Sequence, residues 1–264
     1  MHNPYSQFTE QFAISHRGGA LENPENTMAA FSESINQGYS VLETDLRVTR
    51  DGVLVIHHDE TLQRSAGLPD RIGATDWDEL STIKVFGGHD ILTFDQFVES
   101  IPQDIVLNID PKEYEVLGPL ETFLRDRPEL IKRICLGSFS SDRLIKIRHL
   151  LPQISTSLGG REIAKLVVQS RLRLLKSALR NRLPNQIALQ VPVRAYGIEI
   201  VRPQFVKFVH DLGMQVHVWV VDEPDEMHRL YDIGVDAIMT DRPRVLKKVL
   251  QDRGFWRGTG HGIL

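Results

Sequence analysis

The chain has 264 residues, of which 41% are hydrophobic and 25% charged, and its formal net charge is −4. This composition is typical of a globular protein, and the sequence pI of about 6.2 excludes the basic signature of a nucleic-acid-binding protein. No run approaches the roughly 18 apolar residues of a membrane span, and the N-terminus lacks the basic and apolar regions of a secretory signal.

The chain contains one cysteine, Cys135. A single cysteine excludes an internal disulfide framework and is typical of proteins in a reducing compartment. We therefore expect a cytoplasmic protein.

Eight short runs rich in Val and Ile alternate with helical patterns along the chain. We predict strands at 12–16, 41–46, 104–110, 133–139, 154–159, 186–192, 216–221 and 236–241. Eight strand–helix units in about 250 residues predict an α/β protein, a (β/α)8 TIM barrel that forms a single domain over 1–264. A doubly wound sheet is the alternative, but no glycine-rich phosphate loop follows an early strand.

One connection is much longer than the others. Residues 47–92 separate the second strand from the next helix, whereas such connections usually have 2–6 residues. We predict a hairpin return and then an insertion at approximately 60–92, and we expect flexible tails at approximately 1–11 and 252–264. The insertion follows the C-terminal end of a strand, where barrel enzymes hold their sites, so we expect it to cap a substrate pocket.

Polar side chains gather at the predicted C-terminal strand ends, where they are typical of catalytic residues. They are His16 and Arg17 on the first strand, Glu43 and Asp45 on the second, Asp110 and Lys112 on the third, Gln190 on the sixth, His217 and Trp219 on the seventh, and Thr240 and Asp241 on the eighth. Glu43 and Asp45 point the same way, because side chains alternate along a strand. His217 lies mid-strand and is predicted to be a core residue.

The stretch "VLETDLRVTRDGVLVIHHDE" (41–60) predicts a hairpin. A two-residue "DG" turn would place Asp45 opposite His58, and a register error of one or two residues would still leave a histidine beside the carboxylates. Three carboxylates on neighbouring strands need positive charge among them, and oxygen ligands without thiolates favour Mg²⁺ or Ca²⁺. Nearby cations and two histidines indicate an anionic substrate, for which phosphate is the common case.

These motifs resemble a known family. "HRGGALENPENTMAAF", "LETDLRVTRDGVLVIHHDETLQR", "LNIDPK" and "VHVWVVDEPDEMHRLYDIGVDAIMTDRP" are similar, in order, to the four conserved blocks of glycerophosphodiester phosphodiesterases. The resemblance covers approximately residues 12–250. It implies a TIM barrel with a small insertion after the second strand, and metal-dependent hydrolysis of glycerophosphodiesters to glycerol 3-phosphate and an alcohol.

The resemblance also implies residue roles. His16 and His58 would be the acid–base pair, Glu43, Asp45 and Asp110 the ligands of one divalent cation, Mg²⁺ or Ca²⁺, and Arg17 and Lys112 the phosphate-binding groups. His58 is chosen over His57 because the family's histidine directly precedes Asp, here Asp59. Asp110 departs from the family's usual Glu, which puts the identity of the metal in doubt.

Two other functions remain open from the sequence. A lysophospholipase D would act on lysophospholipids, and the basic stretch 161–182, with seven Arg/Lys and one Glu, could contact an anionic membrane as an amphipathic helix. A barrel that only binds a phosphorylated ligand is the third candidate, and the presence of both histidines and all three carboxylates argues against it. The expected partner is a small glycerophosphodiester, with Trp219 as an apolar wall.

Overall fold

The computed structural model describes residues 2–256 and 258. Eight parallel strands form its centre: β1 (Phe12–His16), β2 (Val41–Val48), β7 (Val106–Pro111), β8 (Ile134–Leu136), β9 (Ser155–Ser157), β10 (Gln186–Val191), β13 (Gln215–Val218) and β14 (Ala237–Thr240). They pair in the order β1-β14-β13-β10-β9-β8-β7-β2, and β1 also pairs with β2. The sheet is therefore a closed barrel, which confirms the predicted fold and all eight predicted strands.

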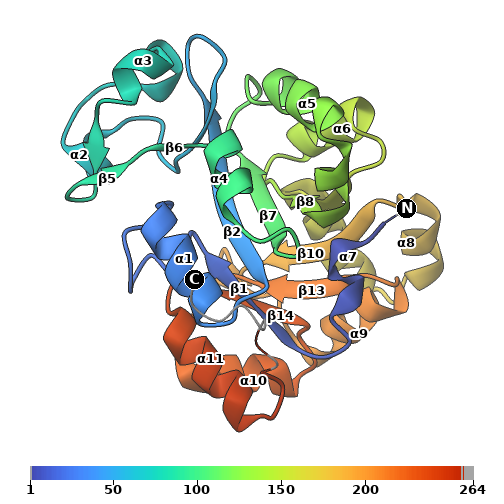
Figure 1. Ribbon diagram of the computed structural model, residues 1–264. Helices are drawn as coiled ribbons and strands as arrows, with labels where there is room; N and C mark the ends of the chain where they lie inside the picture. Colours follow the sequence, from blue (N-terminus) through green and yellow to red (C-terminus); the bar gives the residue numbers. More distant parts are fainter. Residues whose placement is uncertain (1, 257, 259–264) are drawn as a thin grey trace.

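Helices surround the barrel (Figure 1). They are α1 (Met28–Asn36), α4 (Phe94–Ser100), α5 (Leu117–Asp126), α6 (Ser141–Leu150), α7 (Gly160–Arg171), α8 (Leu175–Asn181), α9 (Pro203–Asp211), α10 (Pro224–Asp232) and α11 (Pro243–Asp252), with the 3-10 turns η1 (Pro4–Gln7), η2 (Ile72–Ala74) and η3 (Pro128–Arg133). Local sequence explains where several begin: Thr27 caps α1, Thr93 forms a capping box with Gln96 on α4, and prolines open α9, α10 and α11.

The stretch 161–182, expected as one basic helix, is two helices in the structure. Arg173 lies between α7 and α8 with a φ of 55°, in the left-handed region that interrupts a helix. Among the described residues, no helix is both long enough and apolar enough to cross a bilayer.

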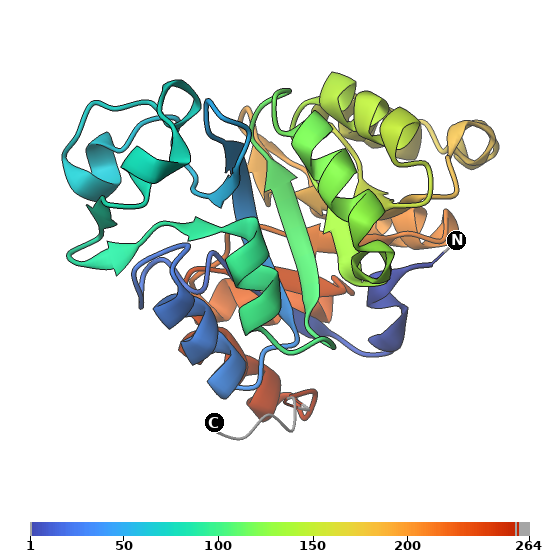
Figure 2. The same ribbon diagram turned by 45° about the horizontal axis from the view of Figure 1, so that its top comes forward.

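The insertion after β2 forms a small unit beside the barrel, at the upper left of Figure 1 and seen from another angle in Figure 2. It contains β3 (Leu54–Ile56), α2 (Gln63–Ala66), α3 (Trp77–Leu80), β4 (Lys84–Val85), β5 (His89–Asp90) and β6 (Leu92–Thr93). A separate apolar cluster holds it together: Val55, Leu62, Ile72, Leu80, Val85 and Ile91 are buried. A second hairpin, β11 (Arg194–Ala195) with β12 (Ile198–Glu199), follows β10.

The N-terminal residues 2–11, expected to be a flexible tail, pack against the barrel instead. The side chain of Tyr5 is fully buried, and its ring lies 4.7 Å from that of His217, edge to face. This burial anchors the segment, and it was missed because one aromatic in a polar stretch has no periodic signal. At the other end, α11 continues to Asp252, and most of the remaining expected tail (257 and 259–264) lies outside the described residues.

Candidate active site

A pocket of about 300 Å³ lies at the C-terminal ends of the barrel strands. All eight side chains that the sequence assigned to a site line it: His16, Arg17, Glu43, Asp45, His58, Asp110, Lys112 and Trp219. Barrel closure brings them together, because parallel strands place all their C-terminal ends at one rim. No residue of 60–92 is among the described lining residues, so this part of the insertion contributes no wall to the pocket. Arg64 connects it to the site through Asp59 and Glu25.

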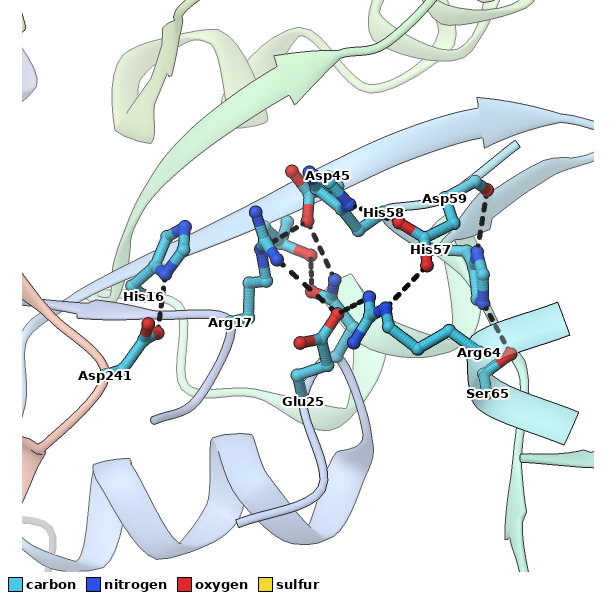
Figure 3. A network of polar contacts seen from close by, with 12 residues as sticks. His16, Arg17, Glu25, Asp45, His57, His58, Asp59, Arg64, Ser65 and Asp241 are labelled. Atoms are coloured by element: carbon cyan, nitrogen blue, oxygen red, sulfur yellow. Dashed lines mark hydrogen bonds and ion pairs between the residues drawn. The ribbon is translucent and has the colours of Figure 1, made fainter. Parts of the chain in front are cut away.

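His16 ends β1 and is held by a carboxylate from the far end of the chain. Its Nδ1 lies 2.6 Å from Asp241 Oδ1 (Figure 3). Its Nε2 lies 3.7 Å from Glu43 Oε2. Burial disfavours the imidazolium, but the charge of Glu43 and the hydrogen bond to Asp241 outweigh it and raise the pKa of His16. The ring is thus oriented with Nε2 available to a ligand.

His58 follows β3 and has a carboxylate of its own. Its Nδ1 lies 2.6 Å from Asp59 Oδ1, and Arg64 Nε donates a 2.6 Å hydrogen bond to Asp59 Oδ2. Burial opposes the ionised carboxyl of Asp59, yet the bonds from Arg64 and His58 lower its pKa to about 2. Burial lowers the pKa of His58, although the charge of Asp45 acts against that shift. Both candidate histidines therefore share one arrangement, in which Nδ1 contacts a carboxylate.

The hairpin register differs by one residue from the prediction. Leu46 pairs with Ile56, and the backbone N–H of His57 donates to Asp45 O, so His57 rather than His58 lies opposite Asp45. The turn is longer than predicted: Thr49 N donates to Val53 O across three residues that end in Gly52, with a φ of 89°. A three-residue turn with a left-handed glycine shifts the register by one position.

The choice between the two histidines is unaffected by this shift. Figure 3 shows the side chain of His57 pointing away from the pocket, where its Nε2 lies 2.9 Å from Ser65 Oγ. His58 points into the pocket. His57 and His58 both lie after the end of β3, so the alternation of side chains along a strand does not set their directions. The side chain of His58 turns back toward Asp45.

Two of the three carboxylates contact a lysine. Lys112 Nζ lies 2.6 Å from Asp45 Oδ1 and 2.7 Å from Asp110 Oδ2. Asp45 Oδ2 lies 2.9 Å from Arg17 Nε. Burial raises the pKa of Asp45, but these two cations outweigh it and hold that pKa below its usual range. Asp45 is therefore ionised and charge-compensated within the protein.

The other two carboxylates are less well compensated. Glu43 Oε2 and Asp110 Oδ1 are buried and accept no hydrogen bond from a described residue. Burial and the charge of Asp45 raise the pKa of Glu43 to about 7, and burial also raises the pKa of Asp110. Buried carboxylate oxygens without partners fit a site for a hard divalent cation.

The described residues nevertheless contain no group of three or more His, Cys, Asp or Glu side chains arranged to hold a metal ion. The ammonium of Lys112 lies where two of the predicted ligands, Asp45 and Asp110, would converge. The ligand set of Glu43, Asp45 and Asp110 therefore stays a prediction.

Four further residues support the site, and the sequence analysis assigned none of them a role. Asn26 donates from Nδ2 to Asp45 Oδ2 (2.9 Å) with its backbone at a φ of 58°. Glu25 Oε1 accepts from Arg64 Nη2 (2.6 Å) and lies 3.5 Å from Arg17 Nη1. The signal for Glu25 and Asn26 was the Pro-Glu-Asn-Thr motif, and Asp241 was among the polar residues at the predicted end of the eighth strand. No local pattern marked Arg64.

An apolar wall closes one side of the pocket. The rings of Trp219 and Phe139 meet edge to face with centroids 4.9 Å apart, and Leu158 and Ile163 line the same pocket. The side chain of Phe139 is 68% exposed, so this wall extends to the rim. Trp219 thus lies where the sequence placed an apolar wall for a substrate.

Comparisons with known proteins agree with this architecture. The model of the "Glycerophosphoryl diester phosphodiesterase family" matches residues 16–245. "Probable glycerophosphodiester phosphodiesterase 2" of Mycobacterium tuberculosis is 36% identical over 252 residues, 94% of this chain and 94% of that protein. Human "Lysophospholipase D GDPD1" is 26% identical over 280 residues, 90% of this chain and 86% of that protein.

A solved structure has the same fold. The phosphodiesterase of Oleispira antarctica, in complex with the product sn-glycerol-3-phosphate, is similar with a TM-score of 0.73 and 22% identity, covering 94% of this chain and 99% of that chain. The family model spans most of the chain, and the mycobacterial relative matches it almost end to end. This chain belongs to the glycerophosphoryl diester phosphodiesterase family, whose members are phosphoric diester hydrolases.

Proposed function

We propose that this protein hydrolyses small glycerophosphodiesters to glycerol 3-phosphate and an alcohol by histidine acid–base catalysis. The observation that carries the proposal is the pair His16 and His58, which line one pocket and each have Nδ1 2.6 Å from a carboxylate. A carboxylate on Nδ1 selects the tautomer that leaves Nε2 free to accept or donate a proton. Two such groups are what phosphodiester hydrolysis needs, one for the attacking hydroxyl and one for the leaving alcohol.

The cationic side of the pocket would bind the phosphodiester. Arg17 and Lys112 lie on either side of Asp45 and present positive charge to the same pocket. Positive groups fixed in a partly buried site stabilise the charge that develops on the phosphoryl oxygens in the transition state. One histidine then removes the proton from the attacking oxygen, and the other protonates the departing alkoxide. The attacking oxygen belongs to water or to the 2-hydroxyl of the glycerol, which would give a cyclic phosphate for water to open.

We also propose one divalent cation, Mg²⁺ or Ca²⁺, bound by Glu43, Asp45 and Asp110. Glu43 Oε2 and Asp110 Oδ1, which are buried and accept no hydrogen bond from a described residue, support this assignment. When bound, the ion would neutralise part of the negative charge on the phosphodiester. Lys112 must then leave at least one of its two carboxylates, and it would be free to contact a phosphate oxygen.

The test is to incubate the purified protein with glycerophosphocholine, glycerophosphoethanolamine, glycerophosphoinositol and lysophosphatidylcholine, with Mg²⁺ or Ca²⁺ in turn. We expect glycerol 3-phosphate from at least one glycerophosphodiester, at a rate that the His16→Ala variant lowers by about 10²–10⁴-fold. Release of free choline together with a lysophosphatidic acid would instead support a lysophospholipase D, which the name of the human relative and the exposed ring of Phe139 favour as second candidate. Binding without turnover of any substrate would support the non-catalytic barrel.

A further inference from the structure

We infer that Asn108 and Gln190 form the floor of the pocket and bind the two hydroxyl groups of the glycerol moiety, and that Tyr5 positions them from below. The inference rests on the proposed function, because it assigns the part of the substrate that the two amides recognise. It adds a specificity-determining pair and a positioning residue to the site.

A hydrogen-bonded column crosses the inside of the barrel. Tyr5 OH donates to Asn108 Oδ1 at 3.2 Å, and Gln190 Nε2 donates to the same oxygen at 2.8 Å. Asn108 lies on β7 and Gln190 on β10, with β8 and β9 between them in the sheet, so the second bond spans the barrel interior. Both amides line the active-site pocket, whereas Tyr5 comes from the N-terminal segment on the opposite side.

Asn108 lies level with Glu43 and one layer below Asp110. It pairs with Glu43 in the register between β7 and β2, and it precedes Asp110 by two residues on the same strand. Residues two apart on a strand point to the same face, so Asn108 and Asp110 both point into the barrel, one layer apart. A phosphate held beside Asp110 and Lys112 would bring the carbon atoms attached to it toward this floor.

The column leaves one donor group and one acceptor for a ligand. Among the residues that the structure describes, the two side chains are engaged only through Asn108 Oδ1 and Gln190 Nε2, so Asn108 Nδ2 and Gln190 Oε1 have no hydrogen-bond partner. One hydroxyl group of a ligand can accept a hydrogen bond from Asn108 Nδ2, and a neighbouring hydroxyl group can donate one to Gln190 Oε1. A ligand without hydroxyl groups would leave these two polar atoms unpaired when it fills the pocket. The pocket therefore favours a ligand that hydrogen-bonds to them over one that cannot.

Gly137 supports the same assignment. A Cβ at this position would lie 2.8 Å from Gln190 Oε1 and 3.5 Å from Ser157 Oγ. Any larger residue would therefore displace the Gln190 amide from the floor. The absence of a side chain at the end of β8 keeps the acceptor oxygen open to the pocket.

Tyr5 determines which way the Asn108 amide faces. It is fully buried, and because its hydroxyl contacts Oδ1 from the lower side, Nδ2 is left for the upper side. Asn3 holds the segment by accepting from Tyr5 N at 2.9 Å. Tyr5 is therefore a positioning residue: it is remote from the reacting atoms and acts through Asn108.

The experiment measures binding of glycerol 3-phosphate and of propyl phosphate, which has the same phosphate and carbon chain without hydroxyls, by calorimetry with and without Mg²⁺. We expect the wild-type protein to bind glycerol 3-phosphate about tenfold or more tightly, as two hydrogen bonds predict. Gln190→Met should lower this preference about 3- to 10-fold and leave the affinity for propyl phosphate within about twofold. Tyr5→Phe should lower the preference about threefold.

Tyr231→Phe is the matched control, because Tyr231 is also buried and its hydroxyl donates at 2.8 Å to Phe12 O, away from the pocket. It should leave the preference unchanged. Gly137→Ala provides a second route to the same result if Gln190→Met does not fold.

Equal loss of affinity for both ligands in the floor variants, or a wild-type protein that does not distinguish them, overturns the inference. Turnover of glycerophosphocholine by the wild type separately tests the proposed function: a protein that prefers glycerol 3-phosphate but cleaves no phosphodiester would refute the activity and leave the floor assignment standing.

Discussion

His57 and His58 are adjacent in the sequence, but their side chains have different surroundings. His58 faces the pocket with Nδ1 on Asp59, whereas the ring of His57 contacts Ser65 Oγ through Nε2 and Asp59 O through Nδ1. Both ring nitrogens of His57 are thus engaged within the insertion. The free nitrogen that proton transfer requires belongs to His58.

We therefore expect His58→Ala to lower kcat by about 10²–10⁴-fold, the range for loss of a general acid or base. His57→Ala should cause a smaller loss of rate together with a lower melting temperature, because it removes two structural hydrogen bonds. His16→Ala should match His58→Ala, and the double variant should fall by less than the product, since both groups serve one reaction. Turnover of glycerophosphocholine and thermal melts check these outcomes. A deeper loss of rate in His57→Ala with an unchanged melt would contradict the assignment.

His217 is a buried group whose titration should affect stability. It is fully buried, its Nδ1 has no partner among the described residues, and burial lowers its pKa from 6.5 to about 4. The unfolded chain therefore binds a proton between these values while the folded protein does not. The free energy of unfolding should fall as the pH drops from 6.5 to 4, by up to about 3 kcal/mol from this residue.

The comparison is with His217→Gln, which cannot titrate in this range. Denaturant unfolding of both proteins at several pH values should show a shallower loss of stability in the variant between pH 6.5 and 4. Parallel curves would show that His217 is not the group responsible.

At the scale of elements, the insertion forms a unit with its own apolar cluster and a polar connection to the site. The connection is Arg64 on α2, which donates to Asp59 Oδ2 and to Glu25 Oε1, both at 2.6 Å. Because Asp59 orients His58 and Glu25 lies near Arg17, α2 positions groups on two different loops. The insertion thus acts on the pocket through charge, whereas its location had suggested a cap over the substrate.

Arg64→Met should lower kcat about tenfold while changing stability little, as expected for a residue that orients a catalytic group. The pair is half-exposed, so its direct contribution to folding is small. Arg71→Met is the control, because Arg71 is in the same insertion and pairs with Glu60 on the surface. Equal rates in the two variants, measured with glycerophosphocholine, would show that Arg64 is only a surface contact.

At the scale of the whole molecule, closure of the barrel concentrates buried carboxylates of Glu43, Asp45 and Asp110 at one rim with two cations. A bound divalent ion would complete the charge balance of this rim.

We expect excess chelator to abolish activity. Loss of a residue that hydrogen-bonds to a metal ligand costs roughly 10- to 100-fold in metal affinity, and Glu43→Ala, which removes a proposed ligand itself, should weaken metal binding by more than this. Calorimetric titration with Mg²⁺ and Ca²⁺ measures the affinity independently of turnover. Glu60→Ala, an exposed carboxylate of the insertion, should bind the ion as the wild type does. Full activity in chelator would contradict the metal assignment.

The size of the pocket leads to an expectation about substrates. About 300 Å³ is at the lower limit for a ligand site and suits a phosphate with a glycerol and a small alcohol. Glycerophosphocholine should therefore be hydrolysed faster than lysophosphatidylcholine, compared by kcat/KM at equal metal concentration. The opposite order would favour the lysophospholipid substrate and a role for the exposed apolar wall of Phe139 and Trp219.

The strand pattern and the chemistry of the rim could be predicted from the order of the amino acids. Continuous apolar runs mark strands buried on both faces, and all eight formed where predicted. The polar side chains at the C-terminal strand ends could be assigned to one site without coordinates, because all parallel strands of a barrel end at the same rim. The family motifs added the choice of His58 over His57.

The groups that support these side chains depend on how the chain folds. Asp241 contacts His16 across 225 residues of sequence, and Tyr5 reaches Asn108 across 103. Neither contact leaves a local pattern, because each depends on how the closed barrel brings distant segments together. The hairpin register was decided the same way: the turn at Gly52 takes three residues, and its backbone bonds rather than its "DG" sequence determine which histidine lies opposite Asp45.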